Sequence, residues 1–137
     1  MRGMNRKTFL TIASVIAFAV GTIAALFPMA ILESKGVTPG APVIVWIRQV
    51  GVAILGIGLV SFLIRGHAPS ATIRAFLYGN AAHQLMLAPI EVVAFRAGTI
   101  TKLSGIVPNT VLHVLLATGF LYFASKERPD SKDSRTA

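Results

Sequence analysis

Long apolar segments without charge constrain this chain more than any other feature. The segment from Thr8 to Leu32 contains no charged residue, and a helix of that length spans the hydrocarbon core of a bilayer. A cleaved signal peptide would have an apolar core of only about 7–15 residues, followed by small residues at the cleavage site. This segment ends instead in Leu-Phe-Pro-Met-Ala-Ile-Leu. We therefore predict a retained transmembrane helix.

Three more long apolar segments follow, and two of them contain charged residues: Arg48 in the second segment, and Arg74 and Glu91 in the third. Hydrophobic residues make up 54% of the chain and charged residues 13%, whereas soluble domains carry about 25% charged residues. Short loops join the segments, so neighbouring spans run antiparallel. The predicted fold is all-α: an integral membrane four-helix up-down-up-down bundle in one domain, residues 1–125. Its spans are 8–32, 42–64, 71–95 and 103–125, and residues 126–137 are predicted to form a disordered cytoplasmic tail.

Basic residues are divided unequally between the two ends of this bundle. One end holds nine, and the other holds three. The nine are Arg2, Arg6, Lys7, Arg65, Arg74, Lys126, Arg128, Lys132 and Arg135, and the three are Lys35, Arg96 and Lys102. The positive-inside rule places both termini in the cytoplasm, with the protein in the cell membrane. The basic residues behind the net charge of +8 are thus explained by their role in orienting the protein in the membrane. We therefore expect no nucleic-acid partner.

Small residues recur on the first two spans. They are Ala13, Ala17, Gly21 and Ala25 on the first, and Gly51, Gly56 and Gly58 on the second. On the first span they repeat every four residues, a spacing that lets a neighbouring helix backbone approach closely. Pro28 is expected to produce a tolerable kink near the outer end of the first span, and Pro108 to mark the start of the last helix.

Polar side chains are grouped on the third span. Asn80, Gln84 and Glu91 fall within about 40° of one another on a helix, with His83 about 60° to one side. Such groups cannot face lipid, so they face protein or a cavity. The neighbouring spans add Arg48 with Gln49, and Asn109 with His113. The candidate ligand-binding residues are Arg48, Gln49, Asn80, His83, Gln84 and Asn109.

Glu91 and His113 are the candidate catalytic pair, because a carboxylate and an imidazole in a dry pocket can act as general base and acid. Arg48 lies at the same predicted depth as Glu91, and we expect the two to form an ion pair. His83 and Glu91 are about 12 Å apart along the helix, too far to share one metal ion. The absence of cysteine excludes thiolate ligands and thiolate catalysis. No metal or other cofactor is expected.

Several short features occur in order along the chain: Leu26-Phe27-Pro28, Gly36-Val37, Arg48 with Gly51, the glycine-rich stretch to Gly58, and Arg65. With these features the layout resembles small bacterial four-helix inner-membrane proteins of the DoxX-like kind and related families of unknown function. The resemblance implies a four-helix membrane protein and no particular activity.

Three functions remain open at this point. The first is binding of a lipophilic or amphiphilic small molecule in a polar intramembrane pocket. The second is an acid–base enzyme of the isomerase, hydratase or cyclase type that acts on a lipophilic substrate. The third is an accessory subunit of a larger membrane complex. The expected partners are the lipid bilayer and, in the first two cases, the small molecule. A homo-oligomer is compatible with all three functions.

Overall fold

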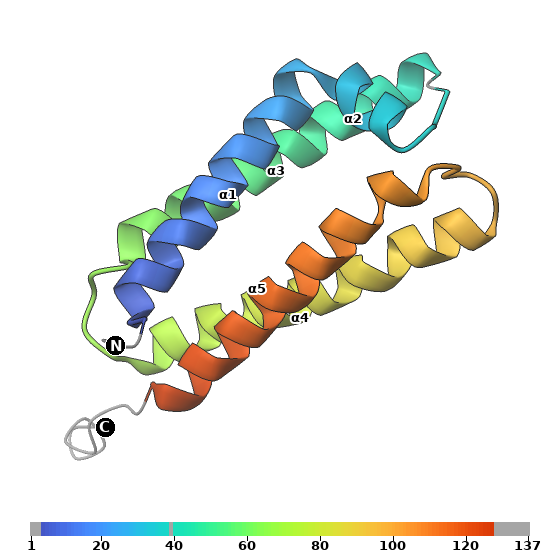
Figure 1. Ribbon diagram of the computed structural model, residues 1–137. Coiled ribbons are helices and arrows are strands. Elements are labelled where there is room, and N and C mark those ends of the chain that lie inside the picture. Colours follow the sequence, from blue (N-terminus) through green and yellow to red (C-terminus); the bar gives the residue numbers. More distant parts are fainter. Residues whose placement is uncertain (1–3, 39, 128–137) are drawn as a thin grey trace.

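The computed structural model describes residues 4–38 and 40–127, and within these ranges the chain is helical without strands (Figure 1). The elements are α1 (Arg6–Leu26), α2 (Pro28–Ser34), α3 (Ala41–Ile64), α4 (Ala71–Arg96), the short 3₁₀ helix η1 (Leu103–Gly105) and α5 (Val107–Lys126). The predicted all-α class is confirmed, and the helix bounds lie close to those expected from the apolar segments.

Helix ends follow local chemistry. The side chains of Asn5 and Ser70 accept hydrogen bonds from backbone N–H groups in the first turns of α1 and α4. The helix α5 has Pro108 in its first turn, as predicted, where the missing N–H removes no helical bond. The predicted continuous span 8–32 is wrong in one respect. It is divided at Phe27, because Pro28 starts a separate short helix, α2.

The helices form two antiparallel pairs, α1 with α3 and α4 with α5 (Figure 1). Glycines allow the first pair to pack closely. A Cβ atom added to Gly51 would lie 2.6 Å from the backbone nitrogen of Ala25, and one added to Gly58 would lie 2.9 Å from Cβ of Ala17. The predicted close approach at the small residues of α1 is therefore confirmed for Ala17, Gly21 and Ala25.

An aromatic cluster joins the two pairs at one end. The ring of Phe9 on α1 lies 5.0 Å, between centroids, from those of both Phe120 and Phe123 on α5. The N-terminal half of α4 adds Ile73, Leu77 and Ala81 to this buried cluster. The apolar core of the molecule is thus concentrated at the end where α1 begins and α5 finishes.

An ion pair joins the two ends of the described chain near the same aromatic cluster. Arg6 lies 2.6 Å from the carboxylate of Glu127 and also donates a hydrogen bond to the carbonyl of His67. The predicted disordered tail is therefore wrong at its start, because Lys126 belongs to α5 and Glu127 is buried. The rest of that predicted tail, 128–137, lies outside the described residues.

Loop contacts join the two pairs at the opposite end. The backbone N–H groups of Thr101 and Lys102 donate to the carbonyl of Lys35, at 3.1 and 3.2 Å. The side chains of the same two residues donate to the carbonyls of Gly36 and Glu33, each at 2.9 Å. The helix pairs are therefore joined at both ends, and these contacts bound the space between the pairs at each end.

Within the described ranges, three helical segments are long and apolar enough to cross a membrane: Arg6–Leu26, Ala41–Ile64 and Leu103–Lys126. Their outward surfaces carry large exposed apolar side chains, such as Trp46, Val52 and Leu115. A soluble protein rarely exposes so continuous an apolar surface. These helices indicate a membrane protein.

Candidate functional site

A cavity of about 660 Å³ lies between the two helix pairs, toward the end that α2 and η1 occupy. A smaller cavity of about 80 Å³ extends toward the aromatic cluster. The two share lining residues on four helices, namely Val20, Ile54, Leu87, Asn109, Leu112 and His113. They therefore form one elongated space, which we call the interpair cavity.

The wall that α1 and α3 contribute along the larger part of the interpair cavity is apolar. Its side chains are Val20, Ile23, Ala24, Ile47, Val50 and Ile54. On α3 the lining positions recur every three or four residues, so they belong to one helical face. This wall offers a ligand dispersion contacts and no hydrogen bonds.

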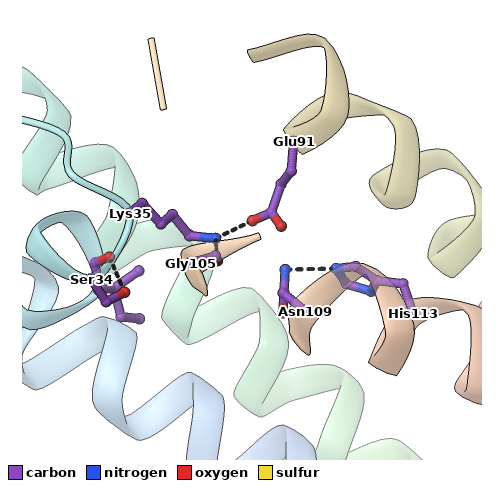
Figure 2. A network of polar contacts seen from close by, with 7 residues as sticks. Ser34, Lys35, Glu91, Gly105, Asn109 and His113 are labelled. Carbon is purple, nitrogen blue, oxygen red and sulfur yellow. Dashed lines mark hydrogen bonds and ion pairs between the residues drawn. The ribbon is translucent and has the colours of Figure 1, made fainter. Parts of the chain in front are cut away.

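The opposite wall combines apolar side chains, such as Leu87, Ile90 and Leu112, with the polar groups of the cavity, and the outermost polar contact is an ion pair. Lys35, at the end of α2, binds the carboxylate of Glu91 on α4 and donates to the carbonyl of Gly105 at 3.1 Å (Figure 2). Each charged side chain is only 16% exposed. The second carboxylate oxygen of Glu91 is buried and has no hydrogen-bond partner in the described part of the chain. The pair therefore brings two opposite charges to the cavity wall with no net charge.

Further along this wall, His113 lies between two amide side chains. Its Nδ1 is 2.5 Å from Oε1 of Gln84, and its Nε2 is 3.1 Å from Nδ2 of Asn109 (Figure 2 shows the second contact). An amide oxygen only accepts and an amide nitrogen only donates, so Nδ1 carries the proton and Nε2 accepts. This arrangement fits a neutral imidazole. Gln84 belongs to α4, whereas Asn109 and His113 belong to α5. The antiparallel packing of these two helices brings the three side chains together.

Two predicted residues lie deeper, along the smaller part of the cavity. The side-chain amide of Asn80 donates to the carbonyl of Phe76 at 2.9 Å, one helical turn earlier. Its amide nitrogen is thus engaged within α4 itself. His83 is half-buried and makes no hydrogen bond with any other described residue.

The predicted roles of Arg48 and Gln49 at the cavity are not supported by their positions. Both side chains are exposed, and neither lines the cavity. Since successive helical residues turn by about 100°, these two point away from the face that Ile47 presents to the cavity. The expected ion pair of Arg48 with Glu91 is wrong, because Lys35 holds that carboxylate.

Lys35 is the site residue that the sequence analysis missed. The apolar segment 8–32 predicts one continuous helix, which leaves Lys35 in the following loop with no contact to the other spans. The division at Phe27 instead gives α2 its own direction and brings Lys35 to Glu91. The signal in the sequence was Pro28 followed by a cation within two helical turns.

The described residues contain no group of three or more histidine, aspartate or glutamate side chains that could hold a metal ion. Comparison with protein-family models, curated proteins and solved structures gave no match for this chain. The resemblance to DoxX-like proteins therefore stays a prediction, and the function must be argued from the geometry of the site.

Proposed function

We propose that this chain is a four-span membrane protein that binds a lipophilic or amphiphilic small molecule in the interpair cavity. The observation that carries the proposal is the cavity itself. Its volume of about 660 Å³ lies within the roughly 300–1,000 Å³ typical of small-molecule sites. Such sites are mostly apolar and carry a few placed polar groups. Here one wall is apolar, and the other bears Glu91, Gln84, Asn109 and His113.

The pairing of the helices supports four spans rather than three. The helix α4 packs along α5, so a bilayer crossed by α5 is also crossed by α4. Arg6 contacts both Glu127 and the carbonyl of His67, which groups the start of α1, the loop between α3 and α4, and the end of α5. An even number of crossings fits this grouping. The excess of basic residues at this end favours a cytoplasmic location for both termini.

Cysteine labelling tests this topology. The chain has no cysteine of its own, so a maleimide reacts only with the single cysteine that is introduced and shows on which side of the membrane that residue lies. Thr99 and Ala68 are exposed and lie in loops at opposite ends of the molecule. In intact cells, a membrane-impermeant maleimide is expected to label Thr99→Cys and to label Ala68→Cys only after lysis. The reverse pattern would contradict the orientation, and equal labelling of both would contradict the even number of crossings.

The hydrogen bonds favour binding over acid–base catalysis. Both ring nitrogens of His113 are engaged, and Glu91 is neutralised by Lys35. A general acid or base needs an atom within hydrogen-bond reach of the substrate. Catalysis is the second candidate, because Glu91 and His113 line the same cavity. Retained binding with lost turnover in Glu91→Gln would support it.

Filling the cavity tests the binding proposal. Val20 lines both parts of the interpair cavity, so Val20→Trp is expected to exclude the ligand. Val15 lies on the same helix but is 59% exposed, which makes Val15→Trp the matched control. Solvent extracts of purified protein, analysed by mass spectrometry, should contain one lipophilic compound with wild type and Val15→Trp. Val20→Trp should reduce it at least tenfold. Equal amounts in all three proteins would contradict the proposal.

A further inference from the structure

The polar wall of the interpair cavity presents a donor and an acceptor whose orientations His113 determines. Oε1 of Gln84 accepts from Nδ1–H of the imidazole, which leaves the NH₂ group of Gln84 available. Nδ2 of Asn109 donates to Nε2, which leaves the carbonyl oxygen of Asn109 available. Neither remaining atom has a partner among the described residues, and neither is among the buried polar atoms sealed from solvent. Each is therefore accessible, on a side chain that lines the interpair cavity.

A ligand group that satisfies both atoms must accept one hydrogen bond and donate another. An alcohol hydroxyl does both, since its oxygen accepts and its O–H donates. An ether or ester oxygen only accepts, a carboxylate only accepts, and an ammonium group only donates. A polar group that enters an apolar cavity loses its hydrogen bonds to water, and without a partner there the free-energy cost of this desolvation is not compensated. The donor and acceptor chemistry of the two amide groups therefore favours a hydroxyl over these alternatives.

The charges around the cavity favour a neutral head group. Lys35 and Glu91 bind each other, and the contacts of His113 fit a neutral ring. The exposed guanidinium of Arg48 lies outside the lining. A charged head group would thus enter a largely apolar space in which no free opposite charge is left to pair with it. Burial of such an unpaired charge is strongly unfavourable.

We propose that the interpair cavity recognises a neutral lipophilic alcohol, whose hydroxyl donates to the carbonyl of Asn109 and accepts from the amide of Gln84. The apolar wall of α1 and α3 holds the hydrocarbon part. His113 is a positioning residue, because it fixes which end of each amide faces the ligand. This inference rests on the proposed binding function and adds the chemical class of the ligand.

Competition among matched probes tests it. The protein in nanodiscs is irradiated with a dodecanol that carries a diazirine in its chain, and cross-linked peptides of α4 and α5 are quantified. Unlabelled 1-dodecanol is expected to compete about tenfold better than 1-methoxydodecane, since one hydrogen bond contributes roughly 1.4 kcal/mol. Dodecane, dodecanoate and dodecylamine should also compete poorly. Equal competition by the alcohol and the ether, or better competition by either ion, would overturn the inference while leaving binding intact. Absence of saturable cross-linking would contradict the binding function itself.

Variants assign the selectivity to these residues. Asn109→Leu and His113→Phe are expected to reduce the alcohol-to-ether ratio to about one while cross-linking persists. Asn109→Asp keeps an acceptor oxygen and should preserve the preference for the alcohol. Gln49→Leu, on the exposed surface of α3, is the control and should behave as wild type. An unchanged ratio in Asn109→Leu would overturn the assignment. The probe competition with wild-type protein decides the chemical class even if a variant fails to fold.

Discussion

Replacing Gly51 by valine is expected to separate α1 from α3 and to lower the free energy of unfolding by about 3 kcal/mol or more. A Cβ atom at this position would lie 2.6 Å from the nitrogen of Ala25 and 2.8 Å from the carbonyl oxygen of Gly21. Both are backbone atoms, so no side-chain rotation relieves the overlap. Helix association within a bilayer depends on such close packing because lipid chains are as apolar as the side chains.

Gly56→Val is the matched control for this prediction. The two glycines share the helix α3, so the change in helix propensity is the same. A Cβ atom on Gly56 would have nothing within 4 Å. Titration of the detergent-solubilised proteins with SDS, followed by circular dichroism, should show early unfolding of Gly51→Val alone. Equal midpoints for the two variants would contradict the close approach of α1 and α3.

Replacing Lys35 by methionine is expected to cost about 3 kcal/mol of stability, because it leaves the carboxylate of Glu91 largely buried without its cation. Both side chains are 16% exposed, and one carboxylate oxygen already lacks a hydrogen-bond partner within the described ranges. The double variant Lys35→Met/Glu91→Gln removes both charges together. It should recover most of the loss, since a buried ion pair often contributes little net stability compared with neutral groups.

Arg48→Met is the control, because this cation is exposed and its removal should change stability by less than about 0.5 kcal/mol. The same SDS titration ranks the four proteins. A large loss for Arg48→Met and a small one for Lys35→Met would show that Arg48, rather than Lys35, neutralises Glu91. Failure of the double variant to recover would show that Lys35 acts through its bond to Gly105 instead.

The sequence predicts which helices exist better than how they are rotated. Long apolar segments locate the helices, because lipid disfavours polar side chains and unpaired backbone groups. Depth also follows from the sequence, since each residue adds 1.5 Å. That is why Gln84, Asn109 and His113 were expected in one column, and the structure brings them into contact.

Rotation about the helix axis depends on which face each neighbour covers. The sequence predicts that Arg48 shares a depth with Glu91, but Gly51 and Gly58 turn another face of α3 toward α1. The glycines therefore indicate the rotation of α3 as well as its close packing against α1. Lys35 was missed for a different reason. Its position depends on the break at Phe27, and whether a proline bends or divides a helix depends on tertiary contacts.

The mass of the intact protein shows whether a ligand occupies the interpair cavity. Wild-type protein released from the membrane in mild detergent is measured by native mass spectrometry. We expect one adduct of a single small-molecule mass, which persists when detergent is stripped and is lost in Val20→Trp but not in Val15→Trp. A bare chain, or only a mixture of phospholipids in the proportions of the membrane, would contradict it.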